Sequence, residues 1–204
     1  AKNLAGKIQF KDVHFSYIEG EEVLRGISLQ VEKGQTVAIV GATGAGKSTI
    51  INLINRFYEI NSGEICVDEV SVKNYDINSL RNQIAVVLQD VFLFSDTILN
   101  NITLKDDRIS LEEVQEAAKK IGIHEFIMSL PGGYNYNVKE RGAMLSSGQR
   151  QLIAFLRAYV SKPSILILDE ATSSVDSHSE QMIQFATDTI TKGRTSIVIA
   201  HRLA

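Results

Sequence analysis

The alternation of apolar and polar residues near the start of the chain predicts a small antiparallel β unit over residues 7–31. Lys33-Gly34 then turns the chain into residues 36–40, a short and mostly apolar run with the composition of a buried strand. Two further strands are predicted at 64–67 and 84–88. The first part of the chain is therefore expected to consist mainly of strands.

The middle of the chain carries helical signals and almost no strand pattern. Ser110 and Glu113 have the spacing of a capping box, and the apolar residues that follow recur at helical intervals. Residues 123–130 predict a second helix, which a Pro-Gly-Gly run ends. We therefore expect an α-helical subdomain over residues 95–144, inserted into a core made of residues 1–94 and 145–204.

The last third of the chain returns to a regular exchange of helices and strands. A helix is predicted from about Ser147, followed by an uninterrupted apolar strand at 165–168. A further helix over 177–190 leads to a last strand at 196–200. Short buried strands that alternate with helices predict an α/β fold with a mostly parallel sheet.

A glycine-rich loop joins the strand at 36–40 to the helix after it. Residues 41–48 read Gly-Ala-Thr-Gly-Ala-Gly-Lys-Ser and fit the phosphate-loop pattern G-x-x-x-x-G-K-[ST], also called Walker A. The glycines let the backbone approach phosphates, and the helix N-terminus favours an anion. Lys47 would contact the β- and γ-phosphates, and the Ser48 hydroxyl would ligate Mg²⁺. The alternative, a glycine turn with a surface lysine, does not explain the strand before the loop and the helix after it. The predicted nucleotide-binding residues are Gly41, Ala42, Thr43, Gly44, Ala45, Gly46, Lys47, Ser48 and Thr49.

Two carboxylates, Asp169 and Glu170, follow the apolar strand at 165–168. In an open parallel sheet the ligand lies at the carboxyl ends of the strands, so both acids are expected to face the phosphate loop. Asp169 suits Mg²⁺, either directly or through a water. Glu170 would polarise the water that attacks the γ-phosphate. The alternative is an acidic cap on the next helix, and the phosphate loop upstream makes it the weaker interpretation.

A second group of small residues lies at the start of the helix near Ser147. It consists of Leu145, Ser146, Ser147, Gly148 and Gln149. Such residues at a helix start usually form a cap, but two hydroxyls and free N–H groups also make an anion site. One chain would then carry two phosphate-binding helix ends but obvious machinery for only one nucleotide.

Composition narrows the possible classes of protein. The chain has 204 residues, enough for one large domain or two small lobes, and 44% of them are hydrophobic. A net charge of −3 gives no reason to propose a nucleic-acid partner. The single cysteine, Cys66, excludes an internal disulfide, and no apolar stretch has the length of a membrane span.

In their order along the chain, these motifs resemble the ATP-binding cassette domains of ABC transporters, and the resemblance covers essentially the whole chain. It implies a P-loop NTPase core that binds ATP and Mg²⁺. It also implies that Tyr17 stacks on adenine, that Gln89 couples Mg²⁺ and the attacking water to the helical subdomain, and that His201 contacts the γ-phosphate. Taken alone, these three would be a strand aromatic, a surface polar residue and a polar residue at a strand end.

The resemblance also implies a head-to-tail dimer with two ATP molecules sandwiched between the subunits. The signature segment, residues 145–149, would bind the γ-phosphate held by the other subunit. Asp176 would close a loop over 173–176 that contacts the opposite site. The partner is either a second copy of this chain or a different nucleotide-binding domain. Ser147 stands where the family usually has glycine, which would weaken or only restyle the second site.

Two stretches resemble the exporter branch of the family. In exporters the neighbourhoods of Gln89 and of Glu140-Arg141 contact the transmembrane domain. The family continues with another strand and more helix after His201, so we expect a C-terminally truncated, itself soluble domain. Its expected function is ATP hydrolysis as the motor of an ABC exporter at the cytoplasmic face of the inner membrane. The alternatives are a soluble ABC-type ATPase acting on nucleic acid or ribosomes, an importer ATPase subunit, and a regulatory nucleotide-binding module without turnover.

Overall fold

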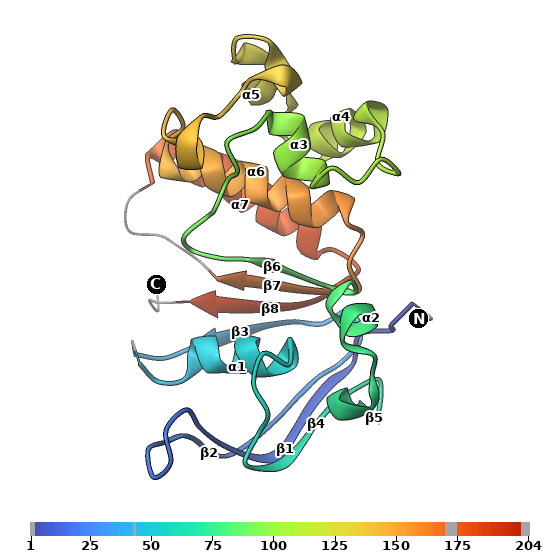
Figure 1. Ribbon diagram of the computed structural model, residues 1–204, viewed down its shortest axis with the longest axis vertical. Coiled ribbons are helices and arrows are strands. Elements are labelled where there is room, and N and C mark those ends of the chain that lie inside the picture. The colour runs from blue at the N-terminus through green and yellow to red at the C-terminus, as the bar shows by residue number, and fades with distance from the viewer. Residues whose placement is uncertain (1–2, 43, 170–174, 201–204) are drawn as a thin grey trace. The chain divides into compact units, whose positions relative to one another are not determined.

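The computed structural model describes residues 3–42, 44–169 and 175–200 (Figure 1). The chain divides into two compact units. The first unit contains Ala1–Val86, Pro163–Glu170 and Gly193–Ala204, and the second contains Val87–Lys162 and Ala171–Lys192. The second unit thus groups later helices with the middle of the chain. The helical subdomain expected over 95–144 alone stays a prediction.

The first unit contains an antiparallel sheet, as the alternating pattern predicts. Its strands run in the order β2-β1-β4-β5 and are β1 (Ile8–Ser16), β2 (Glu22–Val31), β4 (Ser62–Val67) and β5 (Val70–Ser71). The pattern suggests a break between residues 10 and 13, but β1 runs through it with a bulge, where Asp12 has a φ of 45°. The bulge is possible because Gly63 on β4 has no Cβ, which would lie 2.2 Å from the Asp12 carbonyl oxygen.

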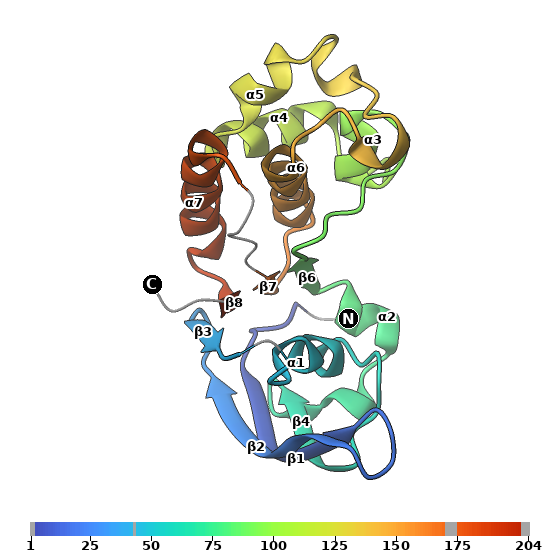
Figure 2. The same ribbon diagram turned by 90° about the vertical axis from the view of Figure 1, so that its left-hand side faces the viewer.

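The second sheet of this unit has the order β3-β8-β7-β6 and consists of β3 (Thr36–Val40), β6 (Ile84–Val87), β7 (Ile165–Asp169) and β8 (Thr195–Ala200). β8 pairs in parallel with β3 on one side and β7 on the other. The helix α1 (Lys47–Ile54) shares one hydrophobic core with both sheets, because Ile51 and Ile54 cluster with β1 and β8 residues (Figure 2). The short segments η1 (Val72–Asn74) and α2 (Ile77–Arg81) follow β5; the sequence pattern misses α2.

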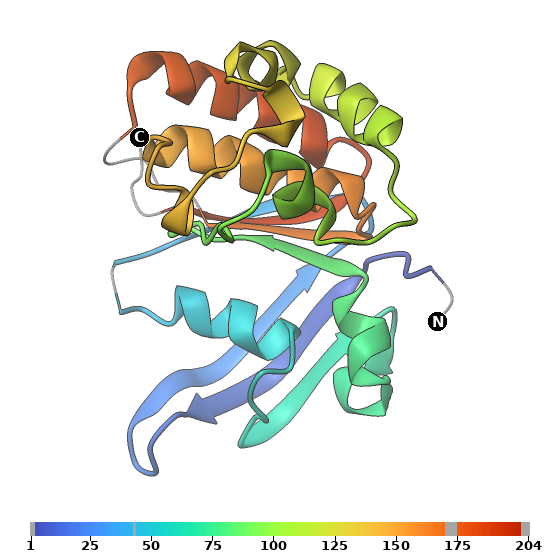
Figure 3. The same cartoon turned by 45° about the horizontal axis from the view of Figure 1, so that its top comes forward.

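The second unit is helical. Its elements are α3 (Ile98–Thr103), α4 (Leu111–Lys120), α5 (His124–Ser129), η2 (Gly133–Asn135), η3 (Glu140–Gly142), α6 (Ser147–Val160) and α7 (Ser177–Thr191). The predicted capping box is confirmed: the side chains of Ser110 and Glu113 each accept a hydrogen bond from the other's backbone. The helix α6 packs against α3, α4 and α7, and Figure 3 shows α6 and α7 side by side. Within the part of the chain that the structure describes, no helix has both the length and the apolar character needed to cross a bilayer.

Candidate nucleotide-binding site

The glycine-rich loop lies between β3 and α1, as its flanking patterns predict. Gly46 is the N-cap of α1 in the left-handed conformation, with a φ of 89°. A Cβ at this position would lie 2.9 Å from a terminal methyl carbon of Leu24, so conformation and space both require glycine. Because glycine has no side chain, no cap side chain satisfies the first N–H groups of α1. This helix start is therefore suited to an external anion.

Lys47 is 6% exposed and lies against the backbone of the loop itself. Its ammonium donates hydrogen bonds to the carbonyl oxygens of Gly41 and of Ala42, the latter at 2.9 Å. Within the loop, the Ala45 N–H donates to the Ala42 carbonyl at 3.1 Å. Thr43 lies outside the described residues. The cation expected to contact phosphates is thus held at the loop by main-chain acceptors.

Asp169 ends β7 at the carboxyl edge of the parallel sheet. It pairs with Ile199 of β8, and Ile199 pairs with Ile39 of β3. At a strand spacing of about 4.8 Å, the backbone of Asp169 lies roughly 10 Å from the strand that leads into the phosphate loop. Mg²⁺ accepts hydroxyl and carboxylate oxygens and keeps several waters that can bridge such a gap. The donor set of Ser48, exposed in the first turn of α1, and Asp169 therefore fits this ion. Glu170 lies outside the described residues.

Tyr17 follows β1 and is anchored to α1. Its hydroxyl lies 3.1 Å from Thr49 Oγ1 and accepts a hydrogen bond from Asn52 Nδ2 at 3.1 Å. Its ring meets the rings of Phe15 and Tyr58 edge-on, with centroids 4.7 and 5.0 Å apart. Tyr17 remains 46% exposed, which leaves ring surface for a stacking partner.

Two members of this aromatic site were missed from the sequence. Asn52 lies one helical turn after Thr49, so the i, i+3 spacing on α1 is a signal that could have identified it. Tyr58 has no local signal that links it to Tyr17, because the two are brought together by the packing of α1 on β1.

The signature segment forms the start of α6 in the second unit. Ser146 is the N-cap, and its hydroxyl oxygen accepts from the Gln149 N–H at 3.2 Å. The Gln149 side chain accepts from the Ser146 N–H at 3.0 Å, which closes a capping box. Leu145 is buried. The expectation that these groups are free is therefore wrong for the N–H groups of Ser146 and Gln149, since each already donates to the other residue.

Gly148 and Asp176 have packing and capping roles in the second unit. A Cβ on Gly148 would lie 2.6 Å from Ser179 Cβ and 3.0 Å from Val175 Cγ1, so glycine lets α6 approach α7. The Asp176 carboxylate accepts from the Ser179 N–H at 2.9 Å, which lowers the pKa of Asp176 and caps α7. Ser173 and Ser174 lie outside the described residues, as does His201.

Gln89 and Glu140 are both exposed, in a loop after β6 and at the start of η3. The chain beyond Gln89 and the chain before Glu140 are joined by hydrogen bonds within the second unit. The Val138 N–H donates to the Asp96 carbonyl at 3.0 Å, and Thr97 bridges to Asn137. The predicted membrane-facing segments therefore belong to one connected piece of structure.

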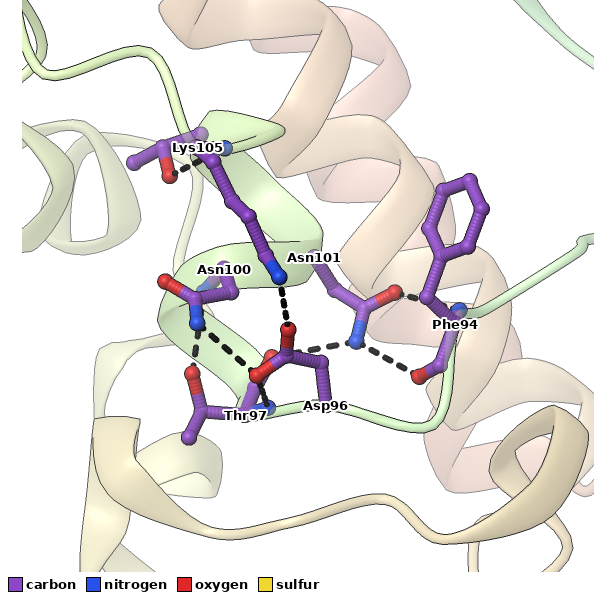
Figure 4. A network of polar contacts seen from close by, with 7 residues as sticks. Phe94, Asp96, Thr97, Asn100, Asn101 and Lys105 are labelled. Atoms are coloured by element: carbon purple, nitrogen blue, oxygen red, sulfur yellow. Dashed lines mark hydrogen bonds and ion pairs between the residues drawn. The ribbon is translucent and has the colours of Figure 1, made fainter.

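Side chains around the start of α3 reinforce this piece (Figure 4). The Asp96 carboxylate accepts from Lys105 Nζ at 2.9 Å, Asn100 Nδ2 at 2.8 Å and the Thr97 N–H at 2.7 Å. These contacts, with Lys105 the largest, lower the pKa of Asp96 to about 2. Asn101 is fully buried and bonds both backbone groups of Phe94.

The phosphate loop, the parallel sheet and the acid at its carboxyl edge define a P-loop nucleotide-binding domain. Residues 24–173 match the family model described as ABC transporter. The chain belongs to the ABC transporter family, and its enzymatic class is ATPase.

Several relatives carry printed names that refer to export. The chain is 48% identical over 205 residues to the putative multidrug export ATP-binding/permease protein YgaD of Bacillus subtilis, covering all of this chain and 35% of that protein. It is 49% identical over 199 residues to the probable multidrug resistance ABC transporter ATP-binding/permease protein YheH of the same organism, covering 98% and 30%. A bacterial Atm1-family ABC exporter with ATP bound has a similar structure, with a TM-score of 0.88 and 43% identity over 97% of this chain and 34% of the other. The predicted α/β P-loop fold is thereby confirmed, and the chain spans about a third of the length of these relatives.

Proposed function

We propose that this chain is the ATP-hydrolysing motor domain of an ABC exporter. The observation that carries the proposal is the carboxyl edge of the parallel sheet. There the start of α1, which has no cap side chain, and the buried Lys47 lie two strands from Asp169. Cation, helix N-terminus and acid together suit a triphosphate with a divalent ion. The names of the relatives support export as the process that the hydrolysis drives.

In this proposal ATP lies on the phosphate loop with its adenine on Tyr17. The hydrogen bonds of Tyr17 to Thr49 and Asn52 hold the ring in register with α1, so base and phosphates are bound by one rigid element. Ser48 and Asp169 would hold Mg²⁺, which when bound supplies neutralisation of the charge on the β- and γ-phosphates. Glu170 is the proposed general base for the attacking water, and His201 the proposed γ-phosphate contact.

A second nucleotide-binding domain would complete the site. The signature segment of that partner would lie against the γ-phosphate, and its Asp176 loop would contact the opposite site. A head-to-tail arrangement of this kind closes with two-fold symmetry and gives two equivalent sites when the partner is a second copy. Gln89 and the Glu140-Arg141 segment would pass the state of the nucleotide to a transmembrane domain. The domain would then work at the cytoplasmic face of the membrane.

Two variants of the full-length protein test the proposal. Glu170→Gln is expected to lower phosphate release by about 10²–10⁴-fold, as for loss of a general base, with ATP binding retained. Lys47→Ala is expected to abolish tight ATP binding, because the variant loses the charge-assisted hydrogen bonds to phosphate. Lys33→Ala, at an exposed turn, is the matched control and should change neither.

The outcomes separate the candidate functions. Retained hydrolysis in Glu170→Gln would remove that residue from the mechanism, and unchanged ATP affinity in Lys47→Ala would remove the phosphate-loop assignment. ATP binding without phosphate release in the unaltered protein would favour a regulatory module. Stimulation of hydrolysis by DNA or ribosomes, but not by lipophilic compounds, would favour a soluble ABC-type ATPase.

A further inference from the structure

The Arg157 guanidinium on α6 is largely buried, and its hydrogen bonds go to main-chain carbonyl oxygens. Its Nε donates to the Asn101 carbonyl at 2.7 Å, and both terminal nitrogens donate to the Phe92 carbonyl at 3.3 Å. Among the described residues, no carboxylate lies within ion-pair distance of Arg157. Burial lowers the pKa of this arginine. A buried charge that is held only by carbonyl oxygens calls for an explanation beyond ion pairing.

Arginine suits this position better than lysine. Asn101 lies near the C-terminal end of α3, where the helix dipole is negative and stabilises a cation. The planar guanidinium reaches carbonyls in two separate segments at once, which the single ammonium of lysine cannot do with the same fixed geometry. Arg157 therefore ties α6 both to α3 and to the chain at Phe92.

The chain at Phe92 is held from a second side. The Asn101 side chain accepts from the Phe94 N–H at 2.8 Å and donates to the Phe94 carbonyl at 3.0 Å (Figure 4). Two buried polar side chains thus fix the backbone at 92 and 94, although the rings of Phe92 and Phe94 are themselves exposed. The fixed segment begins three residues after Gln89, and α6 begins next to Ser146.

We propose that Arg157 is a positioning residue that links the segment carrying Gln89 to the helix that begins at the signature segment. The inference rests on the proposed role of Gln89 in hydrolysis. Through Arg157 a displacement of the chain at Gln89 is transmitted to α6 as a rigid shift, and without Arg157 the two segments move independently. Arg157 acts on turnover through Gln89 and makes no contact with nucleotide.

A double-mutant cycle in the full-length protein tests this link. The variants are Arg157→Lys, Gln89→Ala and the pair, with Arg108→Lys as the control. Arg108 belongs to the same unit, and its guanidinium is exposed and bonded to Asp106. Arg157→Lys is expected to lower kcat by about 10-fold through misplacement of Gln89, with KM for ATP changed less than about twofold. In the Gln89→Ala background, the same change at Arg157 is expected to cause no further loss of kcat.

Each other outcome overturns the link. An unchanged kcat in Arg157→Lys refutes it, and so does an equal loss of kcat in both backgrounds, which indicates a general structural role. If Gln89→Ala itself hydrolyses ATP normally, the proposed role of Gln89 fails and this inference fails with it; a defective Gln89→Ala with additive Arg157→Lys refutes the inference alone. If Arg157→Lys does not fold, Arg157→Met replaces it, because it keeps the length of the side chain and removes the buried charge. Hydrogen exchange should then rise at amides 89–96 and stay unchanged in α4.

Discussion

Replacement of Gly148 by alanine tests how closely α6 and α7 approach each other. The added Cβ would lie 2.6 Å from Ser179 Cβ and 3.0 Å from Val175 Cγ1. Carbon atoms in good contact are about 3.5–4.0 Å apart, so the nearer approach is too short by about 1 Å. One of the two helices must shift to accept the methyl group.

The cost can be estimated from two opposing effects. Overpacking of a buried contact typically costs about 1–3 kcal/mol. Exchange of glycine for alanine within a helix returns up to about 1 kcal/mol, and less in the first turn, where Gly148 lies. Gly148→Ala should therefore lower the free energy of unfolding by about 1–2 kcal/mol. Ser179→Gly removes the atoms that the new methyl group would meet, so the pair should regain at least about 1 kcal/mol relative to the sum of the single changes.

Urea unfolding and ATP hydrolysis, measured on the same four proteins, separate packing from function. If Gly148 also lies against the partner's γ-phosphate, the Gly148→Ala/Ser179→Gly protein should be stable and still hydrolyse ATP slowly. Recovery of both stability and hydrolysis would assign Gly148 to packing alone. A Gly148→Ala protein as stable as the unaltered chain, or one that Ser179→Gly does not rescue, would refute the reasoning from the close approach.

Three further changes have defined outcomes. Tyr17→Phe keeps the ring but loses its hydrogen bonds to α1, so stability should fall by about 1 kcal/mol; titrations should show weaker binding of ATP and unchanged binding of inorganic tripolyphosphate, and equal losses for both ligands would exclude a base-specific role. The pKa of Asp96, held at about 2 against an ordinary 3.8, favours the folded state above about pH 4, and this contribution is lost as the pH falls toward 2. Unfolding experiments should accordingly show Asp96→Asn less stable than the unaltered chain at pH 6, with the difference shrinking toward pH 2, and a pH-independent difference would contradict the cause given for the pKa. Ser146→Asp should keep the helix cap and the melting temperature but abolish hydrolysis, because a carboxylate would repel the partner's γ-phosphate; normal turnover in this variant would argue against the shared site.

The elements that the sequence predicts well are those with a local cause. The capping box at Ser110 lies within four residues, and the strand-loop-helix around Lys47 is contained in one short stretch. The helix α2 was missed because five residues carry too little periodicity, although the Asp76 carboxylate that accepts from the Ser79 N–H is a recognisable cap. The bulge in β1 depends on the close approach of Gly63 on another strand, and no pattern within β1 predicts that.

The same distinction applies to the candidate site. The phosphate loop and Asp169 could be placed at one edge of the sheet, because strand order and direction follow from the α/β pattern. The contacts of Tyr17 with Tyr58 and of Arg157 with Phe92 join residues about 40 and 65 positions apart. In the second contact the acceptor is a main-chain carbonyl, which every residue possesses. The identity of the residue at 92 therefore gives no information about its partner.

The two helix starts that the sequence predicts as phosphate sites differ in how they are closed. At α1 the N-cap is Gly46, which leaves the first N–H groups without a cap side chain, whereas at α6 Ser146 and Gln149 satisfy each other. A serine hydroxyl has one donor and two acceptor lone pairs. Ser146 can therefore keep the hydrogen bond from the Gln149 N–H and still donate its own proton to a phosphate oxygen. Closure of the cap fixes the position of that oxygen before any partner arrives, so the capped start of α6 suits a preformed contact from a second subunit better than it suits a tightly held nucleotide of its own.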